Sequence, residues 1–171
     1  MSASKSVRLG MEPRSAAAAT QSLFDWSKES AEVMPAFLRL LGLQDLGVTG
    51  GEASIVLVID PLRHVNGLGV AHGGVLCTLL DVVMGYSAAS HRDQWQPILT
   101  LSQTVQFVAT AAGRIRAQGR VTGGGRAIVH CTGEVRDERG ELLASGVATF
   151  KRFKKMLPAA DGTAAKMVPN V

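Results

Sequence analysis

The stretch from Gly73 to Ser90 constrains the fold more than any other part of the sequence, because it carries one charged side chain, Asp81, among apolar and small residues. A membrane-spanning helix needs about 20 mostly apolar residues, and an aspartate at its centre costs roughly 2.5–3.5 kcal/mol. A helix that is apolar on all sides can equally form the buried centre of a soluble domain. The alternating patterns that flank the stretch favour burial. We therefore expect a core helix and no membrane span.

Short β-branched or alternating runs predict strands on both sides of this helix. One strand precedes it, at 53–59, and ends at Asp60-Pro61. Four strands follow it, the last three joined by glycine- and aspartate-rich turns: 98–107, 114–122, 126–136 and 141–150. One long apolar helix and about five antiparallel strands must share a core, so the sheet has to curl around the helix. The predicted fold class is α+β, an antiparallel sheet of five to six strands wrapped around a central helix.

The length of 171 residues predicts one domain with extensions. We expect a mobile tail, a helical extension whose helical spacing starts near Ser27, the domain itself and a second tail, over residues 1–20, 21–44, 45–155 and 156–171. The N-terminus lacks the continuous apolar core of a signal peptide. Cys77 and Cys131 lie in apolar stretches without metal or redox spacing, so we interpret them as reduced core residues of a cytoplasmic protein.

The charge balance argues against nucleic-acid binding. Lys and Arg number 18 against 14 Asp and Glu, and part of the excess gathers near the C-terminus in the run 151–155. A nucleic-acid binder would show a broader basic face with aromatic residues, which make up only 5% of this chain. A small anionic ligand suits the charge better.

The histidines lack metal-ligand spacing, and neither a P-loop nor a dinucleotide fingerprint is present, so we expect no metal and no cofactor.

Two features carry candidate chemistry. A carboxylate among leucines and valines, such as Asp81, is either paired or functional, because burying an unpaired charge costs several kcal/mol. Glycines 73 and 74, after His72, would leave N–H groups at the positive end of the helix dipole, where they suit a carbonyl oxygen that becomes negative in acyl transfer. The alternative is a tight start to the helix. Asn66 could add a donor or merely form an Asx turn.

Taken together, the pattern Asn66-x5-His72-Gly73-Gly74-x6-Asp81 resembles the signature of the hotdog-fold acyl-CoA thioesterases. The similarity is closest to the PaaI-type branch of the 4-hydroxybenzoyl-CoA thioesterase superfamily and covers roughly residues 45–152. A downstream Asp-x-x-Gly-x-x-x-Ala-x-Gly pattern and a Thr-Phe ending agree with it. The resemblance implies the hotdog fold and hydrolysis of an acyl-CoA to a carboxylic acid and CoA, without a cofactor.

The resemblance also implies a role for each matched position. The N–H of Gly73 would be the oxyanion donor, and Asn66 would hold and polarise the thioester carbonyl. Asp81 would either activate water or attack the carbonyl directly, two roles that stay open. His72 would shape the site beside the thioester, and Thr100 would position the water.

In such enzymes the site lies between two subunits, so the resemblance implies a homodimer at least and a dimer of dimers as the expected assembly. Apolar helix residues could line a pocket for an aromatic ring or an alkyl chain, and basic residues at the rim could meet the CoA phosphates. The candidate substrate-binding residues are Gly74, Leu76, Leu80, Met84, Arg126, Lys151 and Arg152. An acyl-carrier-protein substrate is an open alternative, and so is a solvated chain end for the basic run.

Two other functions remain alternatives at this stage. A hydratase or dehydratase of acyl thioesters would use His72 and Asp81 to move a proton at carbon. A non-catalytic acyl-CoA sensor could share the fold. The joint presence of Asp81, Asn66 and the glycine pair counts against the sensor, which has no need of the carboxylate.

Overall fold

The computed structural model describes residues 35–93, 95–157 and 166–169. The elements in chain order are α1 (Ala36–Leu40), β1 (Gln44–Thr49), β2 (Glu52–Val58), α2 (Gly73–Ala89), the 3-10 turn η2 (His91–Asp93), β3 (Ile98–Phe107), β4 (Arg114–Gly124), β5 (Ile128–Asp137), β6 (Leu142–Leu157) and β7 (Lys166–Pro169). The predicted tail 1–20, most of the predicted extension 21–44 and most of the predicted tail 156–171 lie outside the described residues.

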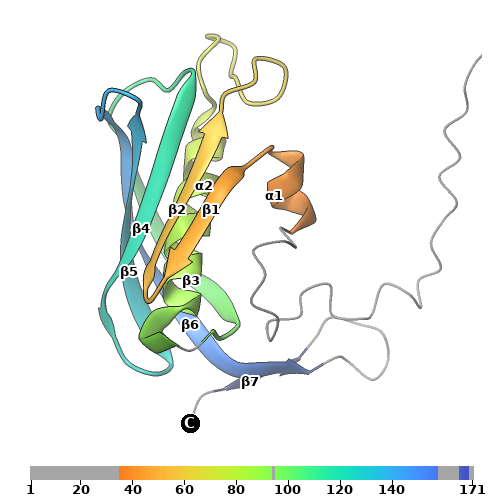
Figure 1. Ribbon diagram of the computed structural model, residues 1–171, viewed down its shortest axis with the longest axis vertical. Helices are drawn as coiled ribbons and strands as arrows, with labels where there is room; N and C mark the ends of the chain where they lie inside the picture. The colour runs from red at the N-terminus through yellow and green to blue at the C-terminus, as the bar shows by residue number, and fades with distance from the viewer. Residues whose placement is uncertain (1–34, 94, 158–165, 170–171) are drawn as a thin grey trace, which may run out of the picture.

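A single antiparallel sheet wraps around α2. Its strand order is β1-β2-β4-β5-β6-β3, and β7 pairs with the end of β6. Figure 1 shows α2 running along the inner side of the curled sheet, with β7 at the lower end of the molecule. This arrangement confirms the predicted α+β hotdog architecture. Helix α2 has 17 residues, and in the described part of the chain no helix combines the length and apolarity needed to cross a membrane.

The structure confirms the five predicted strands, with small differences at most of their ends. Strand β3 has the predicted bounds, and β2, β4 and β5 differ from prediction by one or two residues at their ends. The short strands β1 and β7 were not predicted. Strand β6 extends beyond its predicted end: it continues to Leu157 through the basic run that was a candidate chain end. Pairing explains this extension, because β6 bonds to β5 and β3 as far as residues 151 and 152 and then to β7.

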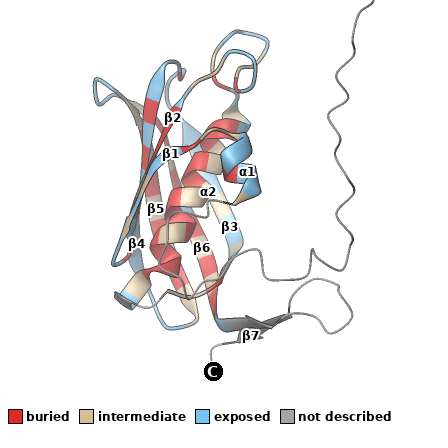
Figure 2. Ribbon diagram, turned by 45° about the vertical axis from the view of Figure 1, so that its right-hand side comes forward, coloured by how far each residue is buried: buried red, intermediate tan, exposed pale blue. Residues whose placement is uncertain are grey.

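A row of small residues lets the helix lie directly on the sheet. Ala53, Gly119, Gly133 and Gly146 are neighbours in register across β2, β4, β5 and β6. A Cβ atom on Gly119 would lie 2.7 Å from the backbone carbon and oxygen of Val83 in α2. The buried face of α2 and the inner faces of these strands together form the core (Figure 2). The close approach of helix and sheet therefore depends on the absence of side chains in this row.

The Gly119→Ala variant should be destabilised by about 1–3 kcal/mol, the usual cost of forcing extra atoms into a packed core. The obstacle is helix backbone, which a side-chain rotation does not relieve. Midpoints of urea unfolding measure the effect. In Gly123→Ala, where an added Cβ meets nothing within 4 Å, the change should stay within about 0.5 kcal/mol. Equal stability of the two variants would contradict this view of the helix–sheet contact.

Candidate active site

Helix α2 has one face that the sheet does not cover. The face toward the sheet is fully buried, whereas Cys77, Thr78, Asp81 and Val82 are only half-buried and Gly74 is exposed. These positions follow helical spacing, so they form one stripe along the helix. Asp81 therefore lies on the open side of α2, within reach of a ligand or a second chain.

The leucines and methionine expected to line an acyl pocket lie on the other face. Leu76, Leu80 and Met84 are 3%, 0% and 0% exposed and belong to the core cluster. Leu80 and Met84 pack over Gly133, where an added Cβ would lie 3.1 Å from each side chain. Within one chain these side chains belong to the core between helix and sheet, because the glycine row lets them pack against the strands.

Strand β3 runs along the open face of α2 and contacts the carboxylate. Thr100 donates a hydrogen bond from Oγ1 to Oδ1 of Asp81 at 2.9 Å. One turn nearer the start of α2, Gln103 donates from Nε2 to the carbonyl oxygen of Cys77 at 3.0 Å. At the end of β3, the Phe107 ring lies over Gly73, where an added Cβ would be 3.2 Å from the ring. The seam between α2 and β3 thus joins the helix start to the carboxylate.

The start of α2 leaves one backbone donor available. His72 is the N-cap, and its Nδ1 accepts the N–H of Gly74 at 2.9 Å. The His72 carbonyl accepts the N–H of Val75, whereas the N–H of Gly73 makes no hydrogen bond within the described residues. This leaves Gly73 available as the donor that the sequence predicts. His72 is exposed and uses one ring nitrogen as a cap, which fits a shaping role.

The loop before α2 is held by His64, which was not among the predicted site residues. His64 is 2% exposed, its Nδ1 accepts the N–H of Asp60 at 2.8 Å, and its carbonyl accepts the N–H of His72 at 2.7 Å. Asn66 lies in this loop and forms an Asx turn, in which Oδ1 accepts the N–H of Leu68. The Asx-turn alternative is therefore realised, and the Nδ2 group of Asn66 makes no hydrogen bond among the described residues.

One chain does not bring the two predicted catalytic groups together. Gly73 and Asp81 are eight residues apart in a continuous helix, which separates them by about 12 Å along the axis. A reacting carbonyl must lie about 3 Å from both its oxyanion donor and its attacking group. The Gly73 and Asp81 of one chain are therefore too far apart to act on the same carbonyl.

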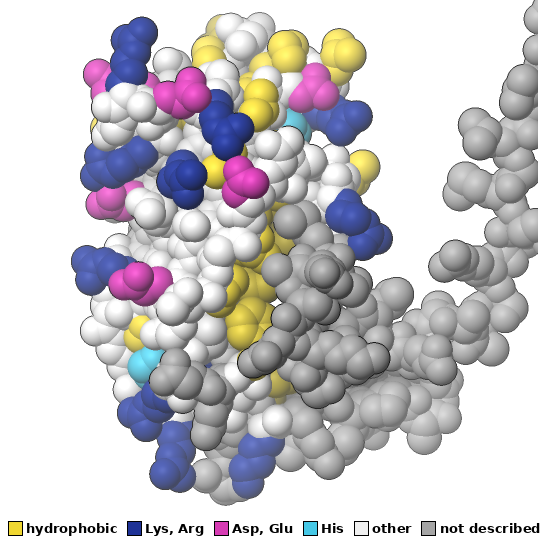
Figure 3. Space-filling view, viewed as in Figure 1, with side chains coloured by type: hydrophobic (Ala, Val, Ile, Leu, Met, Phe, Trp, Pro, Cys, Tyr) yellow, Lys and Arg dark blue, Asp and Glu magenta, His cyan; other side chains and the backbone are white. Residues whose placement is uncertain are grey.

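The predicted basic rim divides into two environments. Arg126 is exposed beyond the end of β4, and Lys151 is half-buried with Nζ 5.4 Å from the centre of the Phe153 ring. Figure 3 shows Lys and Arg side chains, with no Asp or Glu in view among the described residues, at the lower end of the molecule. The pKa of His91 at this end is lowered, first by burial and then by the charges of Arg152 and Arg92.

Arg152 does not lie at the rim. It is 2% exposed, and its Nη2 donates to the carbonyl oxygens of Ala89 and His91 at 3.3 and 2.8 Å. The Ala89 carbonyl is the last one of α2, so this buried cation binds and complements the negative end of the helix, a structural role. Arg152 is therefore buried beneath the end of α2, apart from the accessible cations of the predicted rim.

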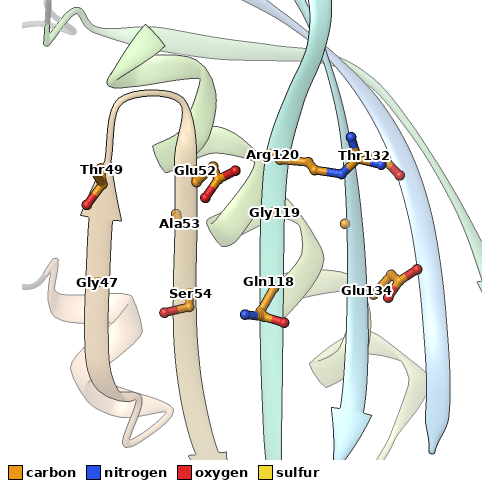
Figure 4. Close-up of a pocket in the computed structure, with 11 residues that line it drawn as sticks. Gly47, Thr49, Glu52, Ala53, Ser54, Gln118, Gly119, Arg120, Thr132 and Glu134 are labelled. Atoms are coloured by element: carbon orange, nitrogen blue, oxygen red, sulfur yellow. The ribbon is translucent and has the colours of Figure 1, made fainter. Parts of the chain in front are cut away.

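A separate polar hollow of about 570 Å³ lies on the outer face of the sheet, opposite α2. Figure 4 shows the side chains that line it, including Glu52, Gln118, Arg120 and Glu134, from strands β2, β4 and β5. It contains none of the predicted site residues.

Of the two free cysteines, Cys131 is buried in the core, and burial raises the pKa of its thiol to about 12. Within the described residues, no group of three or more His, Cys, Asp or Glu side chains could hold a metal.

Comparison with known proteins gives consistent relatives. The profile of the thioesterase superfamily matches residues 68–144. A Pseudomonas aeruginosa protein that carries the name of an esterase is 35% identical over 110 residues, which cover 63% of this chain and 70% of that protein. The structure of a conserved Pseudomonas aeruginosa protein superposes with a TM-score of 0.65 at 30% identity, covering 70% of this chain and 95% of the other.

A mutant form of the phenylacetic acid degradation protein PaaI from Thermus thermophilus superposes with a TM-score of 0.63 at 26% identity, covering 70% of this chain and 100% of the other. The relatives agree with the fold and with the branch that the sequence pattern suggested. On the profile match, the shared fold and the 35% identical relative, this chain belongs to the thioesterase superfamily.

Proposed function

We propose that this protein hydrolyses acyl-CoA thioesters to a carboxylic acid and CoA. Membership of the superfamily supports thioester hydrolysis in general, and the acyl-CoA substrate and the residue roles are the specific proposal. The observation that carries it is the Asp81 carboxylate, half-buried on the open face of α2 and held by Thr100. An aspartate in this position has a hydrogen-bond donor on one oxygen and leaves the other for chemistry.

Asp81 acts on the thioester in one of two ways. As a general base, it takes a proton from water, the resulting hydroxide attacks the carbonyl, and the carbon–sulfur bond breaks to release the CoA thiolate, which then takes up a proton. As a nucleophile, it forms a mixed anhydride with the acyl group and expels the thiolate, and water then hydrolyses the anhydride. In both routes the carbonyl oxygen becomes negative, and the Gly73 N–H at the positive end of α2 stabilises it.

The site is completed by a second copy of the chain. Gly73 and Asp81 of one chain are too far apart to share a carbonyl, so the oxyanion donor of one subunit works with the carboxylate of the other. Strand β3 is an edge strand whose outer residues Leu99 and Leu101 are 47% and 51% exposed. An exposed apolar edge favours pairing with another strand. We infer that β3 pairs with β3 of a second copy and aligns the two helices.

The CoA moiety would lie toward the C-terminal end of α2. Arg126 and Lys151 are the accessible members of the predicted basic rim, and a helix of 17 residues separates this end from His72. From a thioester held near Asp81, an extended pantetheine arm would bring the CoA phosphates to the cations at this rim. Exposed cations attract phosphate groups without a rigid pocket, so their contribution to binding is modest.

Thiol release from an acyl-CoA and from the same acyl group on N-acetylcysteamine, which lacks the nucleotide, tests this placement. In an Arg126→Ala/Lys151→Ala variant, the KM for the acyl-CoA should rise roughly two- to fivefold per cation, as expected for exposed charge pairs of up to about 1 kcal/mol. The KM for the truncated thioester should not change. Arg139→Ala, in the exposed turn at the opposite end of β5, is the control. An unchanged KM for the acyl-CoA would contradict the CoA placement.

A further inference from the structure

Gln103 is an inward-facing amide in the seam between α2 and β3 that the proposed chemistry does not use. It is half-buried, and its side chain donates a hydrogen bond from Nε2 to the Cys77 carbonyl. That carbonyl lies one helical turn before Asp81, and in an α-helix it is the acceptor for the N–H of Asp81 itself. A carbonyl oxygen has two lone pairs, so it accepts both donors. The amide of Gln103 therefore binds the backbone of the turn that carries the carboxylate.

A β-bulge in β3 places Gln103 there. Thr100 pairs with Phe150 and Ser102 with Thr149, so Leu101 is an extra residue without a partner in β6. A bulge of this kind shifts the alternation of a strand by one. Thr100 and Gln103, three residues apart, consequently both face α2, whereas Ser102 and Thr104 are exposed.

We propose that Gln103 is a positioning residue for Asp81, which rests on the proposed thioesterase function. Thr100 fixes the carboxylate itself, and Gln103 fixes the helix backbone beneath it at a constant separation from β3. Without the amide, the turn from Cys77 to Asp81 loses its only side-chain hydrogen bond from β3 to the helix backbone among the described residues. The carboxylate can still act as a base or nucleophile, but its position relative to the substrate changes. A displacement of a reacting group by about 1 Å can lower the rate as much as 100-fold.

The test compares Gln103→Leu, which removes the donor, with Gln103→His, whose Nε2 has a similar reach. In Gln103→Leu, kcat for thiol release should fall roughly tenfold because Asp81 is displaced. The KM should stay within twofold of the wild-type value, because the residues that bind the substrate are unchanged. Gln103→His should retain most of the wild-type kcat. Gln118→Leu, at an exposed position on the outer face of β4, is the matched control and should behave as wild type.

A second measurement needs no substrate. Hydrogen exchange of the amides in residues 77–82 should become faster in Gln103→Leu and stay unchanged in Gln118→Leu. If the wild type releases no thiol from any thioester, the proposed function fails, and the exchange result still decides whether Gln103 holds this turn. A kcat within twofold of wild type in Gln103→Leu, equal losses in the leucine and histidine variants, or unchanged exchange would each overturn the positioning role.

Discussion

Asp81→Ala should lower kcat/KM for thiol release by about 10²–10⁴-fold, the usual contribution of a positioned acid–base group. Asp81→Asn should lose as much, because its amide neither takes a proton nor attacks a carbonyl, although its oxygen still accepts the Thr100 hydroxyl. The aspartate is half-buried at the surface of the core, so both variants should keep the fold. Steady-state kinetics with circular dichroism and size-exclusion chromatography of each variant measure this.

Two further variants separate chemistry from structure. Thr100→Val removes the hydroxyl that binds Oδ1 of Asp81 and keeps the side-chain shape, so its loss should be smaller, on the order of tenfold. Asp45→Ala, an exposed aspartate paired with Arg114, should leave activity unchanged. If Asp81→Ala retained near-normal turnover, the carboxylate would have no part in catalysis and the mechanism would be wrong.

Subunits that carry different defects should restore one another. Gly73→Val should block the oxyanion donor, and loss of one such donor costs about 10²–10³-fold in kcat. In a mixed dimer with Asp81→Ala, one of the two sites combines an intact Gly73 from one subunit with an intact Asp81 from the other. Random pairing makes half of the dimers mixed, so coexpressed variants should show about a quarter of the wild-type rate.

A site built within one chain predicts a different outcome of coexpression. If both catalytic groups came from one chain, each variant would be inactive in every dimer and coexpression would restore nothing. The valine at position 73 also meets the Phe107 ring, so Gly73→Val/Phe107→Ala serves as a second partner that relieves this contact. Gly123→Val, in an open position of β4, controls for the valine itself and should leave the activity of its dimer unchanged.

The architecture and the helix start were predictable because local patterns specify them. The apolar stretch with one carboxylate predicted α2, and the strand-like run 98–107 predicted β3 with its observed bounds. The glycines after His72 predicted a helix start with free N–H groups. The Gly73 N–H is free within the described residues, whereas the Gly74 N–H is capped by the His72 ring, which was not predicted. Strand β1 escaped prediction because its residues, Gln44–Thr49, contain a glycine and little β-branched character, and only pairing with β2 makes them a strand.

What depends on tertiary contacts could not be predicted. The bulge at Leu101 has no sequence signal, and it alone turns Gln103 toward the helix. Arg152 belongs to a basic run that suggests a solvated surface, but pairing of β6 places it beneath the end of α2. An all-apolar helix does not reveal which of its faces meets the sheet, so the sequence could not show that Leu80 and Met84 pack against the strands. The glycines that decide this, such as Gly133, are far away in sequence.

The most direct test of the central claim is the simultaneous measurement of CoA thiol and free acid from a panel of acyl-CoAs, phenylacetyl, hydroxybenzoyl and short to long alkyl, with wild type and Asp81→Ala side by side. We expect the wild type to release thiol and acid in equal amounts from at least one acyl-CoA, and Asp81→Ala to release neither above background. Equal release by both proteins would contradict the role of Asp81. Binding of the acyl-CoAs without release by wild type would contradict thioester hydrolysis.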